Sequence, residues 1–167
     1  MATHSAGIVL YRRTASGQPL EQSVEILLVH PGGPFWANKD EHGWSIPKGE
    51  FDPETETVAD AARREFAEEL GRRAPAPPAD VAAITLEPLR AGRKTIHAVL
   101  IAGEFEPEPI ESNIVEIEWP PRSGQLIDVP EIDRAEWYHL ADARSKLHKG
   151  QAPIVDLIVS ALADTMD

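Results

Sequence analysis

The most informative stretch of the sequence is KGEFDPETETVADAARREFAEELG, which runs from Lys48 to Gly71. Its second half predicts a helix at 58–70, because apolar side chains recur at intervals of three and four residues along it. Thr57 suits the N-cap, with Asp60 three residues later, and Gly71 suits the position at which the helix ends. We therefore expect a capped helix whose apolar face packs against the core.

Three carboxylates crowd another face of this helix. Glu65 lies three residues before Glu68 and four before Glu69, so their side chains can converge. Like charges at this spacing cost roughly 0.2–0.5 kcal/mol per pair, and the negative end of the helix dipole repels them further. Neighbouring arginines could offset the cost, which would make the cluster a solvated surface. A divalent cation could offset it too, because carboxylates and carbonyls are the ligands that Mg²⁺ and Mn²⁺ prefer.

The spacing of this stretch resembles the signature of the Nudix hydrolases. That signature runs Gly, five residues, Glu, seven residues, Arg-Glu-apolar-x-Glu-Glu-x-Gly-apolar. Here Glu56 is followed by seven residues and then by Arg64-Glu65-Phe66-Ala67-Glu68-Glu69-Leu70-Gly71, without a gap. The resemblance extends to the WSIPKG motif at 44–49 and to the order of strands and closing helix across nearly the whole chain. Within the family it points to a bacterial branch predicted to be nucleoside triphosphate pyrophosphohydrolases.

Two positions depart from the signature. Six residues separate Gly49 from Glu56, where the signature has five, and Arg72 stands where it has an apolar residue. Loops absorb single insertions at little cost, so we expect the extra residue to bulge within DPET at 52–55. Gly49 would then keep its place beside the helix.

The resemblance implies a role for each matching residue. The implied metal ligands are Gly49, through its backbone carbonyl, and Glu65, Glu68 and Glu69. The implied catalytic residues are Arg64, Glu65 and Glu68. Glu56 and Gly71 match structural positions of the box, and Glu56 pairs with Arg64, which orients the catalytic carboxylates. The water-activating base would be Glu65 or a glutamate outside the box.

The resemblance also implies an activity. An enzyme of this kind uses Mg²⁺ or Mn²⁺ to hydrolyse a nucleoside diphosphate linked to another moiety, here a nucleoside triphosphate or a dinucleoside polyphosphate. Metal ions suit this chemistry because they neutralise the diphosphate charge and make water nucleophilic. The alternative is a catalytically silent Nudix-like module that binds or senses a nucleotide. The presence of all the box carboxylates favours the enzyme.

Outside the helix, three residues are predicted to bind substrate: Lys48, Trp44 and Arg93. Lys48 could meet a phosphate as a point charge, or could be an exposed loop residue. Trp44, like Trp36 in the same loop, could stack on a nucleobase or anchor the loop to the core. Arg93 belongs to a basic turn that could contact a polyphosphate or be solvated. The resemblance also implies one more carboxylate, which would bind metal or act as the base. The candidates are Glu111, Glu116 and Glu118.

The composition restricts the partners. The chain has 167 residues and a net charge of −12, from 16 basic and 28 acidic residues. Such a charge repels nucleic-acid backbones, so we expect a small-molecule nucleotide and not a nucleic-acid polymer. The chain has no cysteine, which excludes disulfides and cysteine-ligated zinc. With neither a membrane-spanning apolar run nor a secretion signal, we expect a cytoplasmic monomer or homodimer.

The length fits one domain, which we expect to be a single Nudix hydrolase domain over 1–167 with the box at about 49–72. The mixture of strands and helices predicts an α+β fold, a Nudix-type α/β/α sandwich with a mixed β-sheet between helices. The expected strands are 5–13, 23–31, 81–89, 94–105 and 134–140, with 114–119 a strand or a helix start. The expected helices are 58–70, 141–148 and 152–167, and 120–133 is expected to be loop.

Overall fold

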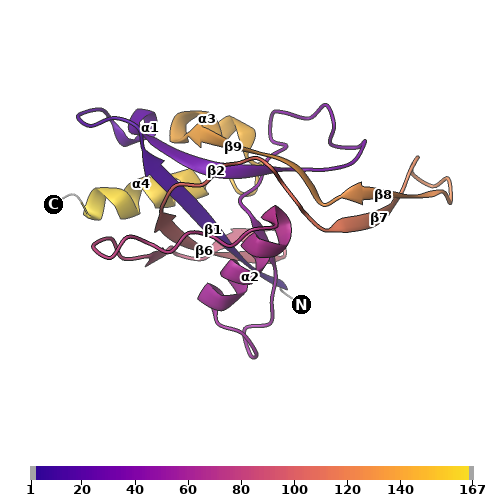
Figure 1. Ribbon diagram of the computed structural model, residues 1–167, viewed down its shortest axis with the longest axis horizontal. Coiled ribbons are helices and arrows are strands. Elements are labelled where there is room, and N and C mark those ends of the chain that lie inside the picture. The colour runs from indigo at the N-terminus through magenta and orange to yellow at the C-terminus, as the bar shows by residue number, and fades with distance from the viewer. Residues whose placement is uncertain (1–2, 166–167) are drawn as a thin grey trace.

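The computed structural model describes residues 3–165 (Figure 1). Its strands are β1 (Thr3–Arg13), β2 (Val24–Pro31), β3 (Lys48–Glu50), β4 (Ile84–Thr85), β5 (Leu89–Ala91), β6 (Lys94–Ala102), β7 (Ile114–Glu118), β8 (Leu126–Pro130) and β9 (Ile132–His139). Its helices are α1 (Leu20–Ser23), α2 (Val58–Leu70), α3 (Leu140–Lys146) and α4 (Ile154–Asp164). The main sheet has the order β4-β6-β1-β2-β9, with β3 beside β1 and β5 beside β6. β1 and β6 are parallel, so the sheet is mixed.

Helices cover both faces of this sheet (Figure 1). On one face, Ile8 and Leu10 of β1 pack in a cluster with Phe66 of α2. On the other face, Val9 of β1 packs in a cluster with Ile158 of α4. Neighbouring strand residues point to opposite faces, and both faces are buried, so β1 reads as a nearly continuous apolar run. The expected α+β fold with a mixed sheet between helices is confirmed.

Helix α2 forms where the sequence predicts it, at Val58–Leu70. Thr57 Oγ1 accepts a hydrogen bond from the backbone N–H of Asp60 at 3.1 Å. Gly71 has a φ of 76°, the left-handed conformation that favours glycine at a helix end. Phe66 is fully buried on the sheet. The caps and this apolar contact fix which face of α2 turns towards β3.

The segment at 120–133 is not the loop that the sequence predicts, because it contains β8 and the start of β9. β8 pairs antiparallel with β7, and the two form a hairpin that projects from the body of the molecule (Figure 1). The prolines and the glycine of this segment suggested a loop. They lie at the hairpin tip and at a strand end, where a proline interrupts few ladder hydrogen bonds.

Other boundaries differ in smaller ways. Instead of one strand at 81–89, only β4 and β5 form, on either side of Pro88, and each pairs with β6. Helix α1 was not predicted, since four residues are too few to show a periodic pattern. The predicted helix at 152–167 is found as α4, and residues 166 and 167 lie outside the described part. Within residues 3–165, no helix combines the length and the hydropathy that crossing a membrane requires.

Trp44 lies in the core and not on a substrate-binding surface. Its side chain is 0% exposed, and its ring meets the rings of His30 and Tyr138 at centroid distances of 5.0 and 5.1 Å. Its Nε1 donates a hydrogen bond to Asp40 Oδ1 at 3.1 Å. No face of the ring is free for a nucleobase, so the prediction that Trp44 binds substrate is wrong. Its role is to anchor the loop that precedes β3.

Candidate active site

Strand β3 brings Gly49 directly against helix α2. β3 pairs antiparallel with β1, and Gly49 lies opposite Ala6. A Cβ atom on Gly49 would lie 1.9 Å from Oε2 of Glu65. Only glycine leaves room for this carboxylate. The β3 backbone can approach the acidic face of α2 this closely because Gly49 has no Cβ.

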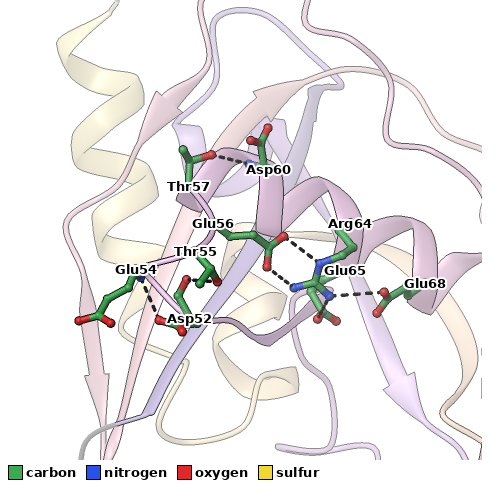
Figure 2. A network of polar contacts seen from close by, with 9 residues as sticks. All are labelled: Asp52, Glu54, Thr55, Glu56, Thr57, Asp60, Arg64, Glu65 and Glu68. Atoms are coloured by element: carbon green, nitrogen blue, oxygen red, sulfur yellow. Dashed lines mark hydrogen bonds and ion pairs between the residues drawn. The ribbon is translucent and has the colours of Figure 1, made fainter.

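The extra residue before Glu56 is taken up in a compact turn. The backbone carbonyl of Asp52 accepts hydrogen bonds from the N–H groups of Thr55 and Glu56, both at 3.0 Å. Asp52 Oδ1 also accepts from the N–H of Glu54 at 2.9 Å (Figure 2). Aspartate favours such turns because its side chain replaces a backbone acceptor. Gly49 therefore keeps its place beside α2, as expected.

Arg64 connects the carboxylate of Glu56, just before α2, with those of Glu65 and Glu68 on the helix (Figure 2). It forms a bidentate pair with Glu56, from Nε to Oε2 at 2.9 Å and from Nη2 to Oε1 at 2.8 Å. Its Nη1 donates to Glu65 Oε1 at 2.8 Å and to Glu68 Oε1 at 3.4 Å. The bidentate pair fixes the plane of the guanidinium group. Arg64 therefore orients Glu65 and Glu68 and offsets part of their repulsion.

Glu69 is the most deeply buried of the three clustered carboxylates. It is 6% exposed, and its Oε2 has no hydrogen-bond partner among the residues that the structure describes. Burial, with the charge of Glu131 as the next cause, raises the pKa of Glu69 from 4.5 to about 8. Lys48 opposes this shift through its charge and its backbone N–H. A buried carboxylate oxygen without a partner is costly, so this position favours a proton or a cation.

Glu131, in the link between β8 and β9, lies within electrostatic range of these carboxylates. Its charge adds to the burial that raises the pKa of both Glu65 and Glu69. The sequence pointed instead to three other glutamates. Glu116 and Glu118 lie on strand β7 of the projecting hairpin, and the backbone of Glu111 packs against Gly71 at the end of α2. Glu131 was missed because its segment was read as loop, and only strand pairing brings it to α2.

Lys48 of β3 lies within electrostatic range of the same carboxylates, although its Cβ lies on the other face of the strand, against Gly7 of β1. Burial lowers the pKa of Lys48 and nearby Lys94 lowers it further, whereas Glu69 and Glu65 act in the opposite direction. Its ammonium group therefore lies within electrostatic range of two carboxylates. Arg93 is exposed in the turn between β5 and β6. The substrate-binding roles of Lys48 and Arg93 both stay predictions.

The donor groups fit a hard divalent cation. Carboxylate and carbonyl oxygens are the ligands that Mg²⁺ and Mn²⁺ prefer. The Oε2 of Glu69 has no hydrogen-bond partner among the described residues, and the Glu65 carboxylate lies directly against the backbone of Gly49. In the described ranges, no three His, Asp or Glu side chains already stand in metal-binding geometry. Two of the carboxylates, Glu65 and Glu68, accept hydrogen bonds from Arg64 instead.

The raised pKa of Glu69 predicts that the metal-free protein loses stability as the pH rises. The folded protein keeps Glu69 protonated up to about pH 8, whereas the unfolded chain releases this proton near 4.5. Between these values the folded state binds more protons, so this contribution to stability is present below pH 4.5 and is lost as the pH approaches 8. The loss is on the order of 4 kcal/mol.

Urea unfolding in EDTA between pH 5 and pH 8 measures this effect. Glu69→Gln keeps the shape of the protonated side chain and removes its titration. We expect the free energy of unfolding to fall more steeply with pH in the wild type than in the variant. Equal slopes in the two proteins would show that Glu69 does not titrate in this range.

Comparisons with known proteins identify the family of the chain. A model of the NUDIX domain matches residues 3–158, so the chain belongs to the Nudix family. The comparison with curated proteins gives no match.

Solved structures are similar to this chain over nearly its whole length. An Ap4A hydrolase binary complex from C. elegans has 20% sequence identity and a TM-score of 0.55, covering 97% of this chain and 98% of that one. The NUDIX domain of Shewanella oneidensis NrtR complexed with ADP ribose has 17% identity and a TM-score of 0.55, covering 97% and 89%. RenU, a Nudix hydrolase from M. smegmatis, has 20% identity and a TM-score of 0.56, covering 96% and 86%. At these identities the similarity establishes a shared fold.

Proposed function

We propose that the protein is a divalent-metal-dependent hydrolase that cleaves a nucleoside diphosphate linked to another moiety. The substrate would be a nucleoside triphosphate or a dinucleoside polyphosphate. The observation that carries this proposal is the pair of buried carboxylates on α2, Glu65 and Glu69, with Glu65 packed directly against the backbone of Gly49. Membership of the Nudix family supports hydrolysis of phosphorus anhydrides in general.

The metal ion in this proposal is Mg²⁺ or Mn²⁺, held by Glu65, Glu68 and Glu69 and by the carbonyl of Gly49. When bound, such a cation neutralises the charge of the diphosphate and lowers the pKa of water. Arg64 would keep Glu65 and Glu68 in fixed orientation through its pair with Glu56. These carboxylates would then be in position before the substrate arrives. Such positioning supplies much of the rate gain in phosphoryl transfer.

The remaining groups would act on the phosphates and on water. The Lys48 ammonium would donate to a phosphoryl oxygen as a point charge. Water would attack one phosphorus, the bridging P–O bond would break, and the proton of the water would pass to Glu65 or Glu131. A carboxylate whose pKa is raised by burial is better suited to accept a proton near neutral pH than an exposed one. The two products would each carry phosphate.

The acidic surface supports a free nucleotide, and not a nucleic-acid polymer, as the substrate, because the net charge of −12 repels long phosphate backbones. A cytoplasmic location and a monomeric or homodimeric state belong to the same proposal. A single domain over the whole chain belongs to it as well.

A nucleotide panel tests the proposed activity. The purified chain would be incubated with nucleoside triphosphates, dinucleoside polyphosphates and ADP-ribose, with Mg²⁺, with Mn²⁺ or with EDTA, and the products followed by ³¹P NMR. We expect at least one nucleotide to give two phosphate-bearing products, and only when a divalent cation is present. Tight binding without turnover of any nucleotide would instead support the nucleotide-sensing module.

A further inference from the structure

The loop at 32–43, between β2 and β3, is held firmly to the body of the molecule. His30, at the end of β2, is 0% exposed. Its Nδ1 hydrogen-bonds to Asp133 Oδ1 at 3.0 Å, and its Nε2 to the carbonyl of Lys39 at 2.8 Å. At the other end of the loop, Trp44 is buried in the core. Because both ends are anchored, the tip of the loop has a defined position.

Two aromatic rings lie at this tip. Phe35 is 50% exposed and is one of the few large hydrophobic side chains that water reaches in the described chain. The rings of Phe35 and Trp36 meet edge to face, with centroids 5.0 Å apart. Lys39 Nζ lies 3.3 Å from the centroid of Phe35 and 5.3 Å from that of Trp36. An exposed phenylalanine ring against a half-buried tryptophan and beside a cation suits a ligand that combines a flat ring with negative charge.

Contacts join this tip to the segment before β3, and charge interactions of Lys48 connect that segment to the carboxylates. The ring of Trp36 packs on that of His148, with centroids 5.2 Å apart. The backbone N–H of His148 donates to the carbonyl of Trp44 at 2.8 Å, beside the segment that leads into β3. Burial lowers the pKa of His148, and the nearby charge of Lys48 lowers it further. The charge of Lys48 acts on Glu69 as well as on His148, so Lys48 lies within electrostatic range of both.

We propose that Phe35, Trp36 and Lys39 form the subsite for the nucleobase of the substrate. This inference rests on the proposed function and deepens it: it assigns the residues that recognise the base, in contrast to an enzyme that recognises the phosphates alone. The base would stack on the exposed ring of Phe35, bordered by Trp36, while the phosphates extend past Lys48 to the carboxylates. Stacking uses the face of a base and not its hydrogen-bonding edge, so adenine and guanine nucleotides should bind with similar affinity.

Equilibrium binding, measured without turnover, tests the subsite. The two probes are an ATP analogue with methylene groups in place of both bridging oxygens and the same methylene-bridged triphosphate without its nucleoside. Isothermal titration calorimetry with Mg²⁺ would give both dissociation constants for the wild type, for Phe35→Ala/Trp36→Ala, and for Leu126→Ala. Leu126 is a matched control because it is also an exposed hydrophobic residue, on hairpin strand β8.

We expect the wild type and Leu126→Ala to bind the nucleoside-bearing probe roughly 10- to 100-fold more tightly than the bare triphosphate. The double variant should bind the two probes about equally and should keep the wild-type affinity for the bare triphosphate. Equal affinities in the wild type, or a preference that survives in the double variant, would overturn the subsite. Absence of hydrolysis in the nucleotide panel would count against the proposed function alone, since these probes are never cleaved.

Discussion

Glu65→Gln is expected to lower kcat for nucleotide hydrolysis by about 10²–10⁴-fold, the range typical for loss of a positioned acid–base or metal-binding group. Glu65 is central to the cluster, because its carboxylate packs against the backbone of Gly49 and accepts a hydrogen bond from Arg64. The glutamine keeps the shape of the side chain and removes its negative charge. Initial rates at saturating nucleotide and Mg²⁺ measure the effect.

The matched control is Glu87→Gln, which removes one negative charge from an exposed position between β4 and β5. Its rate should stay within about twofold of the wild type, because exposed substitutions away from a site have small effects. Circular dichroism would verify that both variants are folded. A kcat that is equally high in Glu65→Gln and Glu87→Gln would remove Glu65 from the active site.

Gly49→Ala is expected to impair both activity and stability. The added Cβ would lie 1.9 Å from Glu65 Oε2 and 2.1 Å from Glu65 Cδ, so either β3 or the carboxylate must move. Overpacking of this kind costs about 1–3 kcal/mol in the free energy of unfolding. A shift on the order of 1 Å at a catalytic group costs about 10²-fold in rate. Urea denaturation and steady-state kinetics measure the two effects.

Gly17→Ala separates the steric effect from a general effect of removing a glycine. A Cβ on Gly17 would meet no heavy atom within 4 Å, although its φ of 77° is strained for alanine. This variant should lose some stability and keep the wild-type rate. If Gly49→Ala also kept the wild-type rate, the contact between β3 and Glu65 would have no part in catalysis.

The sequence predicted the local features of this site well. The bounds of α2, the Thr57 cap and the Gly71 end all follow from interactions within a few residues, which local patterns record. The place of Gly49 beside the helix was also expected in spite of the extra residue, because the turn at Asp52 absorbs it without moving β3.

Features that depend on contacts distant in the sequence could not be predicted in this way. Glu131 comes near these carboxylates because β8 pairs with β7 and β9 pairs with β2. The prolines in that segment led the sequence analysis to predict a loop and not these strands. Trp44 and Trp36 occur in one loop, but burial of Trp44 by His30 and Tyr138 is set by tertiary packing. A residue type shows what a side chain can do, whereas its exposure decides which of those roles it can take.

A divalent cation held by Glu65 and Glu69 is tested most directly by titrating Mn²⁺ into the protein and following free Mn²⁺ by electron paramagnetic resonance. Wild type, Glu65→Gln and Glu87→Gln would be compared at one pH and ionic strength. We expect saturable binding in the wild type and in Glu87→Gln, and at least about 10-fold weaker binding in Glu65→Gln. The same Mn²⁺ affinity in all three proteins would contradict a metal site at this carboxylate cluster.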